Sequence, residues 1–496
     1  MTDWPSKPLI YEINTAVWLT RLSRHYSRPI TLANVPDEIL DELAALHVNA
    51  IWLMGIWERS YSAMMTAQNY AHEYKPALPD LTKDDIIGSA YAVGSYRVDE
   101  DFGGRSGLAH FRQRLRVRGL RLLLDYVPNH VALDHAWTRT HPEYLVLGTP
   151  RDVSRRSDSF YYTRDATGQT IVIAHGRDPY FPGWADTAQV NAFSPELRQA
   201  ALLTLLDIAS QCDGVRCDMA MLMMNDVFAR TWNSYVGTAP RTEYWVDIIP
   251  KVKDQFPNFL FIAEVYWDME HRLQQQGFDF AYDKRLYDRI LEGNVLALRN
   301  HLLAASAFQK RLVRFIENHD EERAMEALGT RKQRPAATLI CTLPGATLLH
   351  DGQLSGRRVK LPVQIRREAY EPVSRELVTF YDCLLNEINA PIYQYGQWTL
   401  FDFRTVDDMP GREHMLAYGW RSEDEHRIVV VNLTDHHTRG IIDLSNWREL
   451  GDANWTLDDI LNGEGYQRSG EVLGRAGLYV ELAAFGVHLF RLRREN

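Results

Sequence analysis

Residues 213–222 read DGVRCDMAML and place two opposite charges inside an apolar run. Because side chains alternate between the two faces of an extended strand, Arg216 and Asp218 lie on the same face. A buried charge without a partner is costly, so an interior strand seldom carries one. The segment therefore predicts either a structural ion pair or a strand that ends at a functional site.

Other short apolar runs have the length and composition of buried strands, and helical patterns separate them. Together with 213–218, the expected strands are residues 9–14, 48–54, 120–125, 258–264, 278–283, 312–320 and 345–352. Eight parallel strands that alternate with helices form a TIM barrel. Two of the helices are expected to begin after Ser106 and Ser194 as N-caps, with Pro195 at the first helical position.

Two segments interrupt this alternation of strands and helices. Residues 131–191 contain no clear helical pattern and indicate a subdomain inserted after the third strand. After residue 391, alternating apolar and polar residues with turn signals predict an antiparallel β-sandwich. The expected α/β organisation is a (β/α)8 barrel over residues 1–130 and 192–390, an inserted subdomain over 131–191, and a C-terminal β-sandwich domain over 391–496.

The composition argues against several classes of partner. The formal net charge is −10 and no basic amphipathic segment offsets it, so nucleic acid is not an expected partner. The 4 cysteines have no zinc-ligand spacing, and no run of about 18 apolar residues could span a membrane. The first residues lack the apolar core of a signal peptide, so a cytoplasmic location is expected. The sequence does not indicate an oligomeric state.

Acidic side chains recur at the predicted C-terminal ends of barrel strands, where the active sites of TIM barrels lie. These residues are Asp125, Asp218, Glu264 and Asp320, with Arg216, His130 and His319 beside them. A carboxylate cluster without clustered Cys or His is typical of glycosidases, which use one carboxylate as nucleophile or base and a second, with a raised pKa, as acid. The strand ends therefore predict sugar chemistry.

Two rival functions fit the same barrel. A metal-dependent amidohydrolase generally needs an HxH pair on the first strand, and the run YEINTAVWL, which begins at Tyr11, contains no His. A non-catalytic carbohydrate-binding relative would keep the barrel but is expected to have lost one or more of the carboxylates. All four are present here, which favours an enzyme.

Four motifs at these strand ends resemble the α-amylase family, glycoside hydrolase family 13. They are DYVPNH (residues 125–130), GVRCD (214–218), AEVYW (263–267) and ENHDEER (317–323), and they occur in the order of the family's four conserved regions. The resemblance also covers the inserted subdomain and the C-terminal sandwich. It implies a TIM-barrel glycosidase that needs no cofactor.

The resemblance implies a retaining mechanism in which Asp218 is the nucleophile that forms a covalent glycosyl-enzyme. Glu264 is implied as the general acid/base and Asp320 as a residue that stabilises the transition state. The substrate-binding residues implied in the same way are Tyr91, Asp125, His130, Arg216, His319 and Arg323. Arg216 is expected to keep Asp218 ionised, because a neighbouring cation lowers the pKa of a carboxylate.

The implied substrate is a small carbohydrate, namely a short α-glucoside or α-gluco-oligosaccharide. Hydrolysis is the leading interpretation. Transglycosylation or isomerisation stays open as the alternative, because these reactions use the same intermediate and differ in what attacks it. Trp57, Trp184 and Trp267 are candidates either for outer sugar subsites or for ordinary packing.

The chain departs from the family's usual calcium site. Where many members place Lys-His after the nucleophile, this sequence has Met221 and Leu222, and Gln189 stands in the motif that usually offers an Asp. Asn129 is retained, but Ca²⁺ needs six to eight oxygen ligands, several of them charged. No metal requirement is therefore expected.

Overall fold

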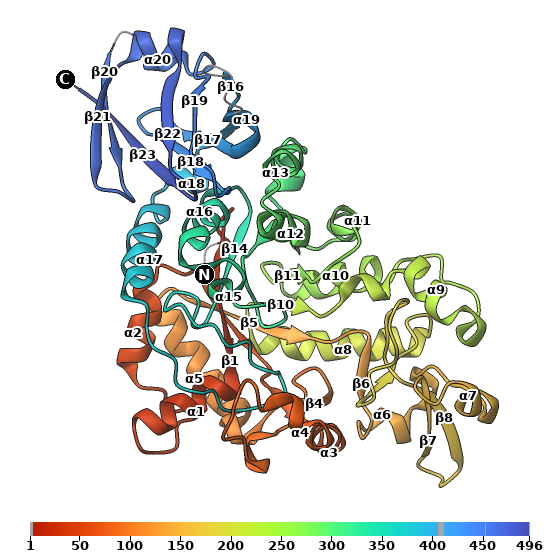
Figure 1. Cartoon of the computed structure of the whole chain (residues 1–496). Helices are drawn as coiled ribbons and strands as arrows, with labels where there is room; N and C mark the ends of the chain where they lie inside the picture. The colour runs from red at the N-terminus through yellow and green to blue at the C-terminus, as the bar shows by residue number, and fades with distance from the viewer. Residues whose placement is uncertain (1–2, 405–410, 452, 496) are drawn as a thin grey trace.

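Eight parallel strands close into a barrel in the computed structural model, which describes residues 3–404, 411–451 and 453–495 (Figure 1). The barrel strands are β1 (Leu9–Asn14), β2 (Ala50–Met54), β5 (Arg121–Tyr126), β10 (Gly214–Cys217), β11 (Leu260–Ala263), β12 (Phe280–Tyr282), β13 (Leu312–Arg314) and β14 (Ala346–His350). Each falls in a predicted run, and the closed order β1-β14-β13-β12-β11-β10-β5-β2 confirms the TIM barrel. In this register Arg216 on β10 pairs with Asp125 on β5 and with Ile262 on β11.

Helices follow the strands along the chain. The longer ones are α1 (Thr15–His25), α2 (Asp37–Ala45), α5 (Gly104–Val117), α8 (Pro195–Gln211), α9 (Asn225–Val236), α10 (Tyr244–Gln255), α12 (Lys284–Glu292), α16 (Gly329–Thr342) and α17 (Arg375–Ile388). The predicted cap of α8 is confirmed, because the Ser194 hydroxyl accepts a hydrogen bond from Leu197 N at 3.2 Å. The predicted Ser106 cap is wrong: α5 already begins at Gly104, after Gly103, whose φ of 104° suits glycine at this turn.

Residues between β5 and α8 form the inserted part of the fold, drawn in ochre beside the barrel in Figure 1. Its strands and short helices are β6 (His130–Ala132), α6 (Trp137–Thr140), α7 (Pro150–Arg155), β7 (Phe160–Arg164), β8 (Thr170–Ala174) and β9 (Thr187–Gln189). Strands β6 and β9 pair antiparallel and set His130 opposite Gln189. The insertion after the third barrel strand is confirmed, while its limits at 131 and 191 stay a prediction.

A small two-stranded sheet that the sequence analysis did not predict lies between β2 and α5. Its strands β3 (Trp57–Arg59) and β4 (Val93–Val98) pair antiparallel with an irregular register. Tyr91 lies just before β4, so this sheet places the Tyr91 ring over the barrel mouth, 5.2 Å from the Arg216 guanidinium.

The C-terminal part consists of two antiparallel sheets that enclose a second apolar core, drawn in blue in Figure 1. One sheet contains β15 (Gln397–Leu400), β17 (Met415–Arg421), β18 (His426–Asn432), β23 (Val487–Arg494), β20 (Asn454–Asp459) and β21 (Glu464–Ser469). The other contains β16 (Phe403–Arg404), β19 (Thr438–Ile442) and β22 (Leu478–Leu482). Trp420 on β17 donates to the Thr342 carbonyl at 2.7 Å and ties this sandwich to α16.

Candidate active site

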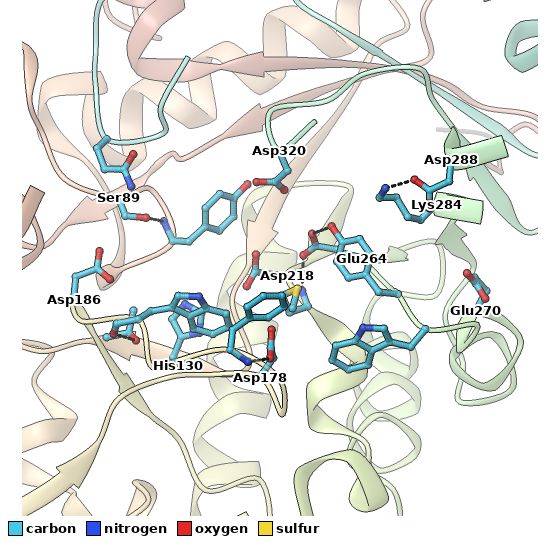
Figure 2. Close-up of a pocket in the computed structure, with 18 of the residues that line it drawn as sticks. Ser89, His130, Asp178, Asp186, Asp218, Glu264, Glu270, Lys284, Asp288 and Asp320 are labelled. Carbon is cyan, nitrogen blue, oxygen red and sulfur yellow. Dashed lines mark hydrogen bonds and ion pairs between the residues drawn. The ribbon is translucent and has the colours of Figure 1, made fainter. Parts of the chain in front are cut away.

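A cavity of about 700 Å³ opens at the C-terminal ends of the barrel strands, between the barrel and the inserted part (Figure 2). Five of the nine predicted site residues line it: Tyr91, His130, Asp218, Glu264 and Asp320. The loop after β10 carries Asp218, the loop after β11 carries Glu264, and the loop after β13 carries Asp320. The barrel geometry thus brings together three carboxylates that are spread over about 100 residues of the sequence.

Arg216 lies beneath these carboxylates and contacts them with its guanidinium group. It is 1 % exposed, and its Nη1 lies 2.9 Å from Asp218 Oδ1 while its Nη2 lies 2.8 Å from Glu264 Oε2. Asp320 Oδ2 and Asp125 Oδ1 follow at 3.6 and 3.7 Å. The buried charge of Arg216 is therefore balanced by a cluster of four carboxylates rather than by one partner.

The charge state of Asp218 differs from the expectation. Burial and the nearby Glu264 raise the pKa of Asp218 to about 8, and the opposing effect of Arg216 does not outweigh them. Arg216 lowers the pKa in the expected direction, but Asp218 is still mostly protonated at pH 7.

Two residues that the sequence analysis did not single out hold Glu264. Tyr266 donates its hydroxyl to Glu264 Oε1 at 2.9 Å, and the backbone N–H of Met219 donates to Oε2 at 2.6 Å. Met219 has a left-handed backbone with φ of 42°, which is uncommon for a residue other than Gly, Asn or Asp. The position of Met219 directly after Asp218 is the sequence feature that could have indicated this contact with Glu264.

His319 connects Tyr91 with Asp320. Its Nε2 lies 2.7 Å from the Tyr91 hydroxyl and 3.0 Å from Asp320 Oδ2, and its ring stacks on Tyr91 with centroids 5.2 Å apart. Its Nδ1 contacts the carboxylate of Glu12, a residue absent from the predicted site. Burial opposes the charge, but Asp320 and Glu12 raise the pKa of His319 well above its usual value.

Asp125 lies one layer deeper than the cavity wall. It is 2 % exposed, accepts a hydrogen bond from Gly55 N at 3.1 Å, and does not line the cavity. Burial raises the pKa of Asp125 to about 6, with Arg216 opposing the shift. In this structure Asp125 lies beside Arg216, and its contact with the sugar stays a prediction.

His130 and two of the three candidate tryptophans form another part of the wall. The His130 ring lies 5.0 Å from the ring of Trp184, and both residues line the cavity, as does Trp267. Burial lowers the pKa of His130 to about 4, so the ring is neutral at pH 7. Trp57 is only 2 % exposed and donates Nε1 to the Asp125 carbonyl at 2.7 Å, which makes it a packing residue.

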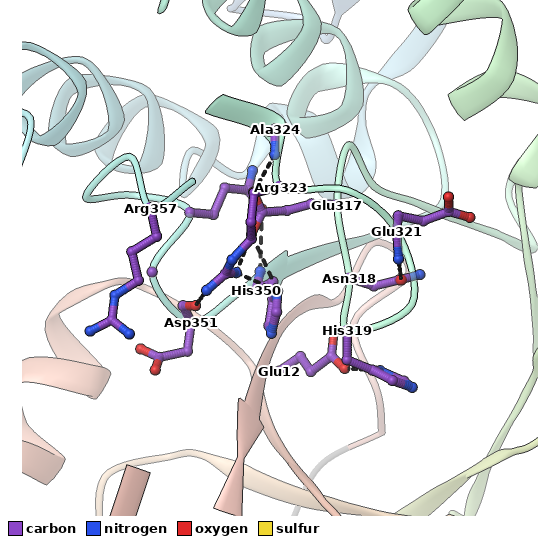
Figure 3. A network of polar contacts seen from close by, with 12 residues as sticks. Glu12, Glu317, Asn318, His319, Glu321, Arg323, Ala324, His350, Asp351 and Arg357 are labelled. Atoms are coloured by element: carbon purple, nitrogen blue, oxygen red, sulfur yellow. Dashed lines mark hydrogen bonds and ion pairs between the residues drawn. The ribbon is translucent and has the colours of Figure 1, made fainter. Parts of the chain in front are cut away.

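Arg323 is one of the four predicted site residues that do not line the cavity. Its Nη1 donates to Glu317 Oε1 at 2.5 Å and lies 2.6 Å from His350 Nδ1, and Nη2 donates to the Asp351 carbonyl at 2.9 Å (Figure 3). These contacts turn the side chain toward β14. The role of Arg323 in substrate binding stays a prediction.

Further charged residues of the wall were missed because they lie in loops and helices without motif character. They are Asp178, Asp186, Glu270, Lys284, Arg285 and Asp288. With Asp218, Glu264 and Asp320, seven carboxylates face two cations in the wall. Lys284 pairs with Asp288 at 2.5 Å and Arg285 pairs with Asp268 at 2.5 Å. The cavity is therefore strongly acidic.

The residues at the family's calcium position do not fit a cation. Gln189 is fully buried, and its Nε2 donates to Asn129 O at 2.8 Å, to Asn129 Oδ1 at 3.0 Å and to Val190 O at 3.1 Å. An amide N–H thus faces the oxygens that would coordinate calcium. Within residues 3–404, 411–451 and 453–495, no group of three or more His, Cys, Asp or Glu side chains is placed to hold a metal ion.

A (β/α)8 barrel with acidic residues grouped around one buried arginine at its strand ends defines a carbohydrate-active TIM-barrel protein. The comparison with known families makes this class specific. The family described as alpha amylase, catalytic domain, matches residues 37–371. The chain belongs to the α-amylase family, as the four motifs predicted.

The relatives agree with this assignment. The chain is 25% identical over 446 residues to the α-amylase MalA of Haloarcula japonica, a match that covers 88% of this chain and 56% of that protein. The chain thus spans little more than half the length of this relative. Among solved structures, an α-amylase from Lactobacillus plantarum has a TM-score of 0.68 at 18% identity and covers 98% of this chain and 99% of its own.

Two further solved structures share the fold. The noncanonic maltogenic α-amylase AmyB of Thermotoga neapolitana has a TM-score of 0.67 at 17% identity, with 98% of both chains covered. The cyclic α-maltosyl-(1→6)-maltose hydrolase of Arthrobacter globiformis has a TM-score of 0.66 at 17% identity and covers 99% of both chains. In the part of the chain that the structure describes, no helix has the length and apolarity to cross a membrane.

Proposed function

We propose that the protein is a retaining α-glycosidase that hydrolyses short α-glucosides or α-gluco-oligosaccharides. Asp218 is the nucleophile, Glu264 the general acid/base, and Asp320 stabilises the transition state through the sugar hydroxyls. The observation that carries the proposal is the pairing of Asp218 and Glu264 on Arg216 at the floor of an acidic cavity that Asp320 also lines.

In the first step an oxygen of Asp218 attacks the anomeric carbon and the bond to the leaving oxygen breaks. Glu264 gives its proton to that oxygen, so the leaving group departs as a neutral alcohol. In the second step Glu264 takes a proton from water, whose oxygen attacks the anomeric carbon and releases Asp218. Asp218 must be ionised to attack, so the substrate is expected to displace the proton that its raised pKa leaves on it at neutral pH.

The other residues of the wall have positioning or binding roles in this proposal. Tyr91 offers its ring to the bound sugar, and His130 offers a neutral imidazole to a sugar hydroxyl. Trp184 and Trp267 provide apolar faces on which pyranose rings stack. The substrate class rests on family membership and on relatives that are named as α-amylases. The cytoplasmic location stays a prediction.

The test is product analysis by ¹H NMR on maltose, isomaltose, trehalose, sucrose and maltotriose. We expect at least one of them to release glucose first as the α-anomer, because two displacements restore the configuration. Initial release of β-glucose contradicts the retaining mechanism. A new disaccharide or isomer in place of free glucose indicates transglycosylation or isomerisation on the same intermediate.

Asp218→Asn tests the nucleophile. The variant is expected to lose turnover while its melting temperature stays at or above that of the wild type, because the substitution removes a buried acid from a crowded carboxylate cluster. Asp207→Asn, on the exposed face of α8 where Asp207 pairs with Arg105, is the matched control and is expected to retain full activity. Turnover by Asp218→Asn at the wild-type rate contradicts the assignment.

A further inference from the structure

A buried carboxylate on the first barrel strand contacts the imidazole of the site. Glu12 on β1 is fully buried, and one of its carboxylate oxygens contacts His319 Nδ1 (Figure 3). The two residues are 307 positions apart in the chain, and the closure of β1 onto β14 and β2 brings them together. Glu12 does not line the sugar cavity.

The second ring nitrogen of His319 faces the opposite way, toward the substrate. Its Nε2 lies 3.0 Å from Asp320 Oδ2 and 2.7 Å from the Tyr91 hydroxyl. A neutral imidazole has one N–H, whereas a ring with a carboxylate on each nitrogen donates from both. The arrangement of Glu12, His319 and Asp320 is therefore that of a charged ring between two carboxylates.

Asp320 depends on this ring for its orientation. Its side chain is 41% exposed, and its other cationic neighbours are Arg216 at 3.6 Å and Lys360, whose Nζ donates to the Asp320 backbone carbonyl at 2.5 Å. An exposed carboxylate on a loop rotates freely unless a short contact fixes it. The contact with His319 supplies that restraint, and burial of the ring at 5 % exposure keeps water from replacing it.

We propose that Glu12 is a positioning residue, which keeps the His319 ring charged and fixed so that Asp320 stays aimed at the bound sugar. The inference rests on the proposed function, since it assigns Asp320 to substrate. Other ionisable groups that face the Glu12–His319 pair are Tyr91, Asp125, Arg216, Tyr282 and Asp320. The small cavity next to His319 is bordered by further charged or titratable groups, namely Arg323, His350, Asp351, Lys360 and Glu368. Of these, Arg323 and His350 belong to the network of Glu317.

The charges around His319 explain how Glu12 keeps this ring protonated. Arg216 and the imidazolium carry the same charge, and on the cavity side of the ring the Asp320 carboxylate lies 3.0 Å from Nε2, beside the Tyr91 hydroxyl. Glu12 supplies a carboxylate on the dry side, where charge interactions are stronger than in water. Replacing it with a neutral group makes the proton on His319 easier to lose.

The experiment compares wild type with Glu12→Gln, which keeps the size of the side chain and removes its charge. In Glu12→Gln the alkaline limb of the kcat/KM profile is expected to move down by about one pH unit or more. At pH 8 the loss of kcat/KM is expected to be about tenfold, and at pH 5.5 the two proteins are expected to differ by less than about threefold. The substrate is the sugar of the NMR panel for which the wild type has the highest kcat/KM.

Glu387→Gln is the matched control. Glu387 is a carboxylate of similar burial at 3 % exposure, and it pairs with Arg427 at 2.5 Å and with Arg491 between α17 and the sandwich. This variant is expected to lose stability but to keep the wild-type pH profile. An unchanged profile in Glu12→Gln, or the same shift in Glu387→Gln, overturns the inference.

¹⁵N NMR of labelled histidine reads the charge on His319 without any turnover, with the signal assigned by its loss in His319→Gln. We expect a doubly protonated ring at pH 8 in the wild type and a neutral ring in Glu12→Gln. A neutral ring in the wild type overturns the inference even if the enzyme is active, whereas a charged ring in an inactive wild type overturns only the proposed function.

A failure of Glu12→Gln to fold is itself informative through a second variant. In that case Glu12→Gln/His319→Gln is expected to restore folding, because it removes both members of the buried pair and leaves no charge unpaired. A double variant that is no more stable than Glu12→Gln overturns the inference.

Discussion

Arg216 Nη2 lies 2.8 Å from Glu264 Oε2, so the residue proposed as the acid faces a cation in the resting structure. Tyr266 and the backbone of Met219 also donate to Glu264, so three contacts fix the position of its side chain. Burial and the neighbouring Glu264 raise the pKa of Asp218 to about 8. A nucleophile must be ionised, so we expect substrate binding to displace the proton from Asp218.

The first prediction concerns Tyr266→Phe. Without the hydroxyl, Glu264 loses a donor that holds its carboxyl group in place, so kcat/KM is expected to fall by about tenfold. Tyr381→Phe, which removes a buried hydroxyl bonded to Gln333 and Gln353 far from the cavity, is the control and should keep the wild-type value. An unchanged kcat/KM in Tyr266→Phe contradicts the assigned hydrogen-bond role.

The strand ends made much of the site predictable. Asp125, Asp218, Glu264 and Asp320 each follow a strong apolar run, and a parallel barrel gathers such ends on one face. Period-two alternation likewise placed Arg216 beneath Asp218, because it depends only on local chain geometry. Local pattern and barrel closure together were enough for the fold and for the centre of the site.

Contacts set by side-chain direction and by distant strands were not predictable. Glu12 meets His319 across the barrel, which no local pattern encodes, and Arg323 turns to Glu317 although its motif position suggested the cavity. Ser106 has the chemistry of a cap, but the positive φ of Gly103 ends the preceding turn earlier. Each difference arises where tertiary packing chooses between options that the local sequence allows.

The second prediction concerns acid stability and His135 in the inserted part. Burial lowers the pKa of His135 to about 4, below the unfolded value of about 6.5. As pH falls through 6.5 the unfolded state binds the proton first, so this group's contribution of up to about 3 kcal/mol is lost progressively between about pH 6.5 and pH 4. His135→Asn keeps an acceptor for Trp137 N and removes the titration.

Urea unfolding at pH 7 and pH 5 measures this effect. The wild type is expected to lose more stability between the two pH values than His135→Asn does, by about 2 kcal/mol. His72→Asn, at a side chain that is 76% exposed, is the control and should follow the wild type. Equal losses in the wild type and His135→Asn would show that the buried ring does not control acid sensitivity.

The third prediction is that the cavity discriminates against anionic glycosides. Seven wall carboxylates face Lys284 and Arg285, and both cations are already paired with acids. We expect kcat/KM for maltose 6′-phosphate to be at least about tenfold below that for maltose, with a smaller gap at high salt. Equal values for the two sugars at low salt count against an acidic recognition surface.

Glu270 gives this discrimination a pH dependence. Burial raises the pKa of Glu270 to about 7, and its side chain lines the cavity. The carboxyl group is therefore mostly neutral at pH 6 and mostly charged at pH 8, so the preference for maltose should widen as pH rises. Glu270→Gln is expected to flatten this trend, while Asp207→Asn on exposed α8 should leave it unchanged.

The last prediction concerns metal removal and the amide at position 189. Gln189 donates to Asn129 and Val190, so the bond between the two ends of the inserted part needs no cation. We expect activity and melting temperature to be unchanged by EDTA. A drop of several degrees that added calcium reverses would show that backbone carbonyls or another part of the insertion hold an ion.

Gln189→Glu inverts this arrangement. The substitution removes the N–H donors and places a carboxylate against Asn129 O and Oδ1, so oxygens face oxygens in a fully buried position. The variant is expected to lose about 2 kcal/mol or more of stability in EDTA, because a buried charge is left without a partner. Millimolar calcium should recover part of that loss, since the site then offers the charged oxygens that this ion selects.

Gln211→Glu at the end of α8, where the amide bonds to Asp207, is the matched control and should show no response to calcium. If Gln189→Glu is as stable as the wild type in EDTA, the Gln189 amide does not hold the two ends of the inserted part together.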